Sequence, residues 1–324
     1  MTLRRSIAGL LPVAAAALAA FTAGTLGAQG QKPRPAVTQQ QVDRWMKDAN
    51  NWGRWGKEDQ LGTINLITVA KRQQAVALAK TGTTVSLAHK PQLVPKSKSE
   101  SAGAHLQIKL NMLAVGFTTE DQEIAFHGST FTHIDGLCHG DYDGKIYNGY
   151  SLKDTVSAAG CQKLGINNLA GGIVTRGILI DIPRLKGVAS LPPGTQVYVE
   201  DIEAWEKMAG LKISTGDAIF LHTGRWASGQ TSGFDVSVAP WLRARDVALI
   251  GSDGILDAGE VPGTTLPLHK YVLVALGMNI VDNADLTALA ETAARLKRWE
   301  FLLVAAPIAT PGGTGSPLNP LAIF

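Results

Sequence analysis

The sequence has little of what marks several common classes of protein. Its 324 residues include only two cysteines and contain no CxxC pair or zinc-finger spacing, so a metal site built from thiolates is excluded. The formal net charge is only +3, and no dense basic run occurs beyond the N-terminus, which argues against nucleic acid or an extended anionic partner. No internal repeat is evident. The length and a hydrophobic content of 45% are typical of a globular α/β protein with a sizeable core.

The N-terminus has the pattern of a targeting segment. Arg4 and Arg5 precede an apolar, alanine-rich stretch at 7–26, and the small residues Gly27 and Ala28 follow. We therefore predict a signal peptide at 1–28, for the Sec or the twin-arginine route. A retained membrane anchor is the competing interpretation, since about 20 apolar residues can span a bilayer. The prediction is an exported protein, periplasmic or secreted, without stable membrane insertion after cleavage.

Histidine is concentrated in one stretch, H-G-S-T-F-T-H-I-D-G-L-C-H, at 127–139. On an extended strand His133 and Asp135 project from the same face, because side chains alternate. His139 follows beyond Gly136, where the chain can turn. An imidazole and a carboxylate on one face are suited to a divalent metal, and the further histidine could be a general base or another ligand.

Several apolar runs predict strands around this stretch. Strands are also expected at 106–114 and 122–126, directly before it. Continuous apolar runs within 172–182, 216–226 and 247–254 predict buried strands, as in parallel sheets, with polar residues at their carboxyl ends. Ligands favour that end of a parallel sheet.

The motif T-H-x-D-x-x-x-H resembles the signature of the metal-dependent cyclase-like amidohydrolases, the family of bacterial kynurenine formamidase and isatin hydrolase. Those enzymes usually read H-x-G-T-H-x-D-x-P-x-H. The resemblance implies that His133 and Asp135 bind metal and that His139 is the acid/base. The first family ligand falls on Ser129 here. His127 lies two residues further back, so it is a candidate ligand only if the backbone bulges.

Four more segments extend the resemblance over nearly all of 45–324. They resemble the family's W-G-x-x-D-x-x-G-T-x-N, Y-D-G-K-x-Y-N-G, G-D-x-x-x-x-x-T-G and G-G-T-G-S-P-x-N-P patterns. By resemblance the last of these covers the site. The residues they add as candidates for substrate binding are Trp52, Trp55, Tyr142, Tyr147 and His222. Packing in the hydrophobic core is an equally suitable role for the two tryptophans. A structural role is equally suitable for His222.

A distant pair completes the metal site by resemblance. His269 matches a family ligand, and Asp282 stands where the family has glutamate, a side chain one methylene longer. We expect one metal on His133, Asp135 and His269, with Asp282 as a further candidate. Zn2+ is the first expectation for the metal and Mn2+ the second.

Cys138 replaces the family's proline before the last histidine, and Cys161 lies in a glycine-bounded loop. Two cysteines in an exported protein invite a disulfide. Because a bridge would constrain the loop of the candidate site, we expect two free thiols.

The resemblance implies an α/β fold of the swivelling β/β/α type, a single domain at 45–324 with a barrel-like sheet core and outer helices, after a linker at 29–44. It implies a metal-dependent hydrolase that cleaves an amide, formamide, lactam or related acyl bond of a small molecule, as a homodimer or homotetramer. A cyclase or dehydratase of natural-product metabolism is one alternative. A non-catalytic binding protein, which the Ser129 departure would explain, is the other.

Overall fold

The computed structural model describes residues 34–90, 105–113, 115–229 and 231–324. The predicted signal peptide lies outside the described residues. Val37–Phe324 form one compact unit. In the part of the chain that is described, no helix is long and apolar enough to cross a membrane.

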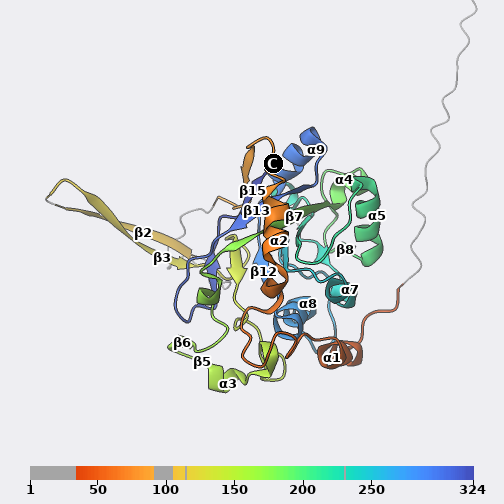
Figure 1. Ribbon diagram of the computed structural model, residues 1–324, viewed down its shortest axis with the longest axis horizontal. Coiled ribbons are helices and arrows are strands. Elements are labelled where there is room, and N and C mark those ends of the chain that lie inside the picture. Colours follow the sequence, from red (N-terminus) through yellow and green to blue (C-terminus); the bar gives the residue numbers. More distant parts are fainter. Residues whose placement is uncertain (1–33, 91–104, 114, 230) are drawn as a thin grey trace, which may run out of the picture. The chain divides into compact units, whose positions relative to one another are not determined.

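A nine-stranded sheet forms the centre of this unit, in the order β1-β15-β13-β7-β9-β11-β12-β4-β14 (Figure 1). Its strands are β1 (Thr84–Ser86), β4 (His133–Asp135), β7 (Ile173–Asp181), β9 (Ala218–His222), β11 (Leu249–Ser252), β12 (Asn279–Asp282), β13 (Glu300–Ala305), β14 (Gly315–Pro317) and β15 (Leu321–Ile323). Short two-stranded sheets pair β8 (Gln196–Val197) with β10 (Gly233–Phe234) and β5 (Val156–Ser157) with β6 (Gly160–Cys161).

The middle of the sheet is parallel and its flanks are antiparallel. β7, β9, β11 and β12 run parallel, whereas β4 pairs antiparallel with both β12 and β14. The carboxyl ends of the parallel strands, which carry Asp181, His222, Ser252 and Asp282, therefore lie along one edge of the sheet. The buried strands and their polar ends were predicted from the sequence, and the structure confirms them.

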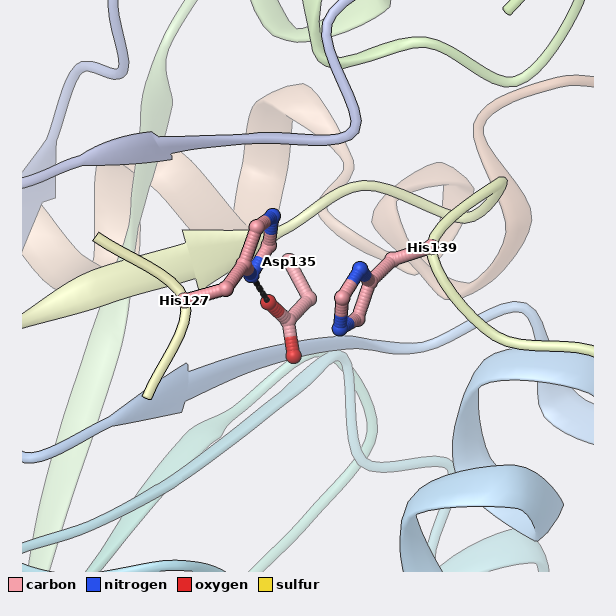
Figure 2. A group of neighbouring side chains, drawn as sticks. All are labelled: His127, Asp135 and His139. Carbon is pink, nitrogen blue, oxygen red and sulfur yellow. Dashed lines mark ion pairs between the residues drawn. The ribbon is translucent and has the colours of Figure 1, made fainter. Parts of the chain in front are cut away.

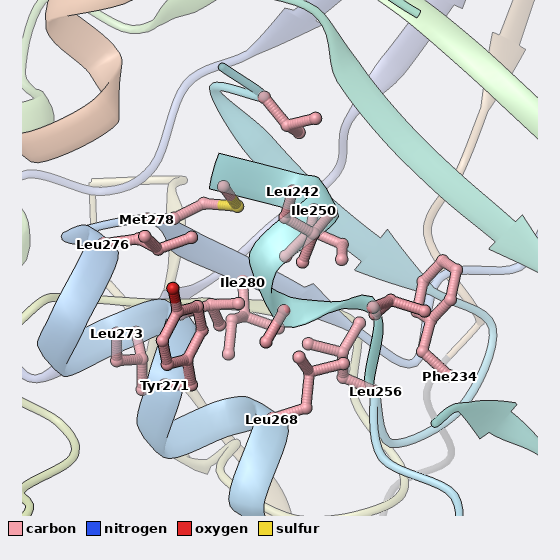
Figure 3. Close-up of a cluster of buried hydrophobic side chains, with 14 of the residues drawn as sticks. Phe234, Leu242, Ile250, Leu256, Leu268, Tyr271, Leu273, Leu276, Met278 and Ile280 are labelled. Carbon is pink, nitrogen blue, oxygen red and sulfur yellow. The ribbon is translucent and has the colours of Figure 1, made fainter. Parts of the chain in front are cut away.

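Apolar side chains on both faces of the sheet form two cores. Ile178 and Ile180 of β7 belong to one core and Leu179 to the other, as the alternation of a strand requires. The first core also contains the buried side chains of the helical segments around Tyr271 and Leu242 (Figure 3). Because both faces are covered, the strands are apolar nearly throughout.

Helices cover these cores. The α-helices are α1 (Gln39–Asp48), α2 (Val69–Val76), α3 (Leu152–Thr155), α4 (Ile182–Lys186), α5 (Val199–Ala209), α6 (Arg225–Ser228), α7 (Ala239–Ala244), α8 (Pro267–Lys270) and α9 (Thr287–Leu296), and the π-helix η6 (Tyr271–Leu276) continues α8. The short 3-10 helices are η1 (Gly62–Leu66), η3 (Tyr147–Gly149), η4 (Ile166–Leu169) and η5 (Val236–Val238). The fold class predicted from the sequence, α/β with a barrel-like sheet and outer helices, is confirmed.

The first helix, α1, begins with a capping box. Thr38 accepts a hydrogen bond from the backbone N–H of Gln41 at 3.3 Å, and the Gln41 side chain accepts one from the Thr38 N–H at 2.8 Å. This reciprocal capping box satisfies two donors that a helix start leaves without partners. It explains why α1 begins at Gln39, within the residues predicted as a linker.

A hairpin of β2 (His105–Met112) and β3 (Thr118–Ala125) leads into the histidine-rich stretch (Figure 1). Both strands were predicted from the sequence and are confirmed. On β2, Ile108, Leu110 and Met112 share one face and are exposed. β3 ends two residues before His127, so the hairpin sets where that histidine enters the site.

Candidate metal centre

The site is built around β4, a three-residue strand between two neighbours. Asp282 of β12 lies opposite His133, and Gly315 of β14 lies opposite Asp135. The register therefore brings a second carboxylate beside the first imidazole. All three polar side chains, His133, Asp135 and Asp282, are buried.

His133 and Asp135 lie on the same face, as the alternation predicts. The His133 Nε2 atom lies 3.5 Å from Asp135 Oδ1. The other ring nitrogen, Nδ1, is hydrogen-bonded to the Phe131 carbonyl oxygen at 2.8 Å, which fixes it as the donor. The Nε2 lone pair is thus left facing the carboxylate, the orientation that metal-binding histidines adopt.

His127 reaches the same carboxylate from a bulged segment. Its Nδ1 lies 3.2 Å from Asp135 Oδ1, and its Nε2 lies 3.0 Å from the Thr314 hydroxyl. Its ring stacks on that of His139, with centroids 3.9 Å apart (Figure 2). Ser129, four residues before His133, directs its backbone carbonyl to Arg225.

The C-terminal glycine-rich segment packs tightly against this group. A Cβ on Gly315 would lie 3.0 Å from His127 Cε1 and 2.5 Å from the Ile134 carbonyl oxygen, so only glycine fits there. The Gly136 N–H also donates to the Thr314 carbonyl at 2.7 Å. The segment therefore lies directly against the site.

His269 joins the cluster through Asp282. Its Nε2 lies 2.9 Å from Asp282 Oδ2, and its Nδ1 lies 2.5 Å from Asp257 Oδ2. Burial by itself lowers the pKa of His269, but the two carboxylates outweigh it and raise that pKa well above the ordinary value. A protonated imidazole has no lone pair for a metal, so in this arrangement His269 holds Asp282. Coordination by His269 would require loss of its Nε2 proton and stays a prediction.

The donor set fits a divalent metal. Two groups of metal-ligating atoms, each within 4.8 Å of one another, share Asp135: His127, Asp135 and His139 form one, and His133, Asp135 and Asp282 form the other. In the described part of the chain, Asp282 Oδ1 is buried without a hydrogen-bond partner, and the buried atoms His127 Nδ1 and Asp135 Oδ1 meet only ligand atoms of the cluster itself. Buried polar atoms are rarely left so, and three of them converging here point to a bound cation.

The pKa values of the cluster suit this role. Burial raises the pKa of Asp135, but the neighbouring imidazoles, His127 first and then His139 and His133, outweigh it and lower the pKa, so the carboxylate is ionised. Loss of hydration lowers the pKa of His139, although part of its surface is open to solvent; Asp135 opposes the shift and His127 adds to it. His139 is therefore a neutral base at neutral pH.

The five residues predicted to bind substrate lie in different surroundings. Trp52 and Tyr142 line a cavity of about 400 Å³ beside α1, where the Trp52 indole N–H donates to the Val274 carbonyl. Tyr147 is fully buried, and its hydroxyl donates to Asp59 at 2.9 Å. Trp55 is half-buried and packs against the second core. His222 Nδ1 lies 3.0 Å from Asp181 Oδ1, beside another cavity of about 410 Å³. A role in substrate binding stays a prediction for all five.

The two cysteines form a disulfide, Cys138–Cys161, so the expectation of free thiols was wrong. The reasoning assumed that a bridge would hinder the site loop. In the structure the bridge joins that loop to Cys161. The backbone N–H of Cys161 in turn donates a hydrogen bond to the Gly312 carbonyl. The disulfide is therefore one of the contacts that hold the loop of the site in place.

Sequence reasoning missed the residues that hold the ligands in place. Asp257 orients His269, Thr314 orients His127, and Arg225 and Asn283 contact the segment between His127 and His133. Asn283 could have drawn attention as the residue after a candidate ligand. Nothing in the sequence connects Asp257 or Arg225 with the site, because only the fold brings them there.

Comparisons with known proteins show the family of this chain. The Cyclase family model matches residues 80–256, more than half of the chain. A solved structure described as a novel cyclase is 31% identical, with a TM-score of 0.75, and the match covers 85% of this chain and 97% of that one. The protein therefore belongs to the cyclase family, as the resemblance implied.

More distant structures share the fold. Isatin hydrolase A from Ralstonia solanacearum is 22% identical with a TM-score of 0.51, covering 79% of this chain and 97% of its own. Isatin hydrolase A from Labrenzia aggregata, solved with benzyl benzoate, is 19% identical with a TM-score of 0.54, covering 78% and 98%. No match was found among curated proteins.

Proposed function

We propose that this protein is a metal-dependent hydrolase that opens an amide, formamide or lactam bond of a small molecule. The observation that carries the proposal is the convergence of three buried ligand atoms that have no hydrogen-bond partner outside the cluster, on His127, Asp135 and Asp282, beside a neutral His139. The isatin hydrolases among the similar folds support a cyclic amide as one substrate class.

The residues divide into two tasks. His127, His133, Asp135 and Asp282 hold the cation, for which we expect Zn2+ first and Mn2+ second. When bound, the metal acts as a Lewis acid on a carbonyl oxygen and makes water acidic enough to lose a proton near neutral pH. His139 takes that proton at a ring nitrogen and returns it to the leaving nitrogen. The stacked His127 ring keeps the His139 imidazole facing Asp135.

The number of metals follows from Asp135. Both groups of ligand atoms include its carboxylate, so Asp135 would help to hold a metal in either group. If His139 is the base and not a ligand, the group with His133 and Asp282 keeps all three of its donors, and His127 adds a fourth from the other group. We therefore propose one tightly held metal.

Metal analysis followed by a hydrolysis screen tests the proposal. Purified protein should contain about one divalent metal per chain and hydrolyse at least one of N-formyl arylamines, isatin-like lactams or cyclic imides. If the protein binds metal but forms a ring from a linear precursor, the cyclase alternative stands. If it holds no metal and none restores turnover, the binding-protein alternative replaces both.

Export is part of the proposal. Disulfides persist in oxidising compartments and are rare in the cytosol, so Cys138–Cys161 supports a periplasmic or secreted location. The signal peptide and the homodimer or homotetramer stay predictions.

A further inference from the structure

The spacing from His127 to His133 is two residues longer than the family pattern that the sequence resembles, and Ser129 stands at the usual ligand position. The chain must therefore bulge for His127 to reach Asp135. Residues 127–131 form bends between β3 and β4. Such a bulge lacks the regular ladder of a sheet, so its backbone groups need other partners.

Two side chains from other parts of the chain provide these partners. The Asn283 amide N–H groups donate to the Gly128 carbonyl at 2.7 Å and to the Phe131 carbonyl at 3.2 Å. Arg225 Nη2 donates to the Ser129 carbonyl at 2.7 Å. We call Arg225 and Asn283 the bulge clamp.

The clamp is itself rigidly held. Arg225 Nη1 donates to Asn283 Oδ1 at 2.5 Å, and the Arg225 backbone N–H donates to Asp253 Oδ2 at 3.2 Å. Asp253 is buried and also accepts hydrogen bonds from Thr223 and Gly224. Asn283 is fully buried, with a φ of 55°, a left-handed conformation that asparagine tolerates better than most residues.

The clamp also connects two candidate ligands. Asn283 follows Asp282 directly, and its own carbonyl accepts a hydrogen bond from the Thr132 hydroxyl, next to His133, at 2.6 Å. The same residue therefore touches both ends of the bulge and the strand that carries Asp282. A shift of His127 relative to Asp282 requires these bonds to break.

We propose that Arg225 and Asn283 are positioning residues that fix the bulge so that His127 serves as the metal ligand in place of Ser129. The inference rests on the proposed function only in that a divalent metal binds at this site. A purely structural clamp would stabilise the fold and leave metal affinity unchanged. A positioning clamp acts on the metal through His127.

The test measures the affinity of the full chain for Zn2+ by competition with a chelator of known affinity. Asn283→Asp keeps the oxygen that accepts from Arg225 but loses both donors to the bulge. Asn283→Gly tolerates the left-handed backbone and adds no charge. Both variants should bind Zn2+ roughly 10- to 100-fold more weakly, the usual loss for residues that orient metal ligands.

A matched control removes a buried hydrogen bond far from the bulge. The Thr175 hydroxyl donates to the Gly216 carbonyl at 2.5 Å, so Thr175→Val lowers stability by a similar mechanism. It should bind Zn2+ as the wild type does. Equal weakening in this control would show that lost stability alone lowers the affinity, and would overturn the proposal.

A double-mutant cycle shows whether the clamp acts through His127. Once His127→Ala has removed the ligand, adding Asn283→Asp should weaken Zn2+ binding by no more than about twofold. Losses that multiply in the double variant would overturn the proposal, as would wild-type affinity in both Asn283 variants. If metal binding behaves as expected and no substrate is hydrolysed, the clamp stands and the proposed function fails. Absence of Zn2+ binding by the wild type would overturn both.

Discussion

Removal of the Cys138–Cys161 disulfide should lower the stability of the protein by an amount that follows from the chain length it closes. The two cysteines are 23 residues apart. Closing a loop of that length reduces the entropy of the unfolded chain by an amount worth about 3.4 kcal/mol at 25 °C. The unfolding entropy of a unit of this size turns that loss into a decrease of about 6 °C in the midpoint of thermal unfolding.

The perturbation is the double variant Cys138→Ser and Cys161→Ser, compared with the wild type by urea denaturation without reductant. The expected result is a loss of about 3 kcal/mol in the free energy of unfolding. Both cysteines are buried, so a small further loss from the buried hydroxyls is expected.

Reductant supplies the control. Treating the wild type with reductant at unfolding concentrations of urea should reproduce the lower midpoint, whereas the double variant should not respond to it. A wild type that is as stable with reductant as without it, or a double variant within about 0.5 kcal/mol of the wild type, would refute the reasoning, because the loop-closure entropy would then be absent.

Further predictions concern the site and its surroundings. His133→Ala should abolish metal content, whereas His139→Ala should keep the metal and lose most turnover; equal metal loss in both would make His139 a ligand. Because the pKa of His139 is lowered, turnover should stay constant as pH falls to the ordinary histidine value of 6.5 and decline only below it, as a pH–rate profile will show. Removal of metal with a chelator should lower the thermal midpoint, since saturation at 100 times the Kd stabilises by about 2.7 kcal/mol; an unchanged midpoint would mean that no metal binds the folded state. The His222–Asp181 pair should stabilise the fold most between pH 3.8 and 6.5, because the raised pKa of His222 gives a contribution that is lost at high pH and the lowered pKa of Asp181 gives one that is lost at low pH. His222→Gln should therefore cost most stability in that window, and a cost independent of pH would contradict the assignment.

Local patterns in the sequence determined a large part of the structure. Alternation predicted that His133 and Asp135 share a face, and unbroken apolar runs predicted the parallel strands and the edge where their polar ends gather. These features succeed because each depends on a few neighbouring residues, whose spacing sets the face on which a side chain lies.

Only part of the site could be predicted from such local patterns. His133 and Asp135 are two residues apart on one strand, so the sequence alone places them together. His127 could not be placed, because its position depends on a bulge held by Arg225 and Asn283, which are 96 and 155 residues away from the carbonyls they bind. The disulfide was predicted wrongly for the same reason, since nothing near Cys138 in the sequence reports its distance from Cys161.

The sequence by itself therefore determined the chemistry of this protein: an imidazole and a carboxylate on one strand, a third histidine after a turn, and a family pattern that implies a metal. The tertiary structure decided which residues form the site and how they are arranged. Strand pairing places Asp282 opposite His133, and His269 lies between Asp257 and Asp282. His127 contacts Asp135, although Ser129 stands at the ligand position of the family pattern. Side-chain type and local alternation are properties of the chain, whereas strand register and buried long-range hydrogen bonds exist only once the sheet has formed.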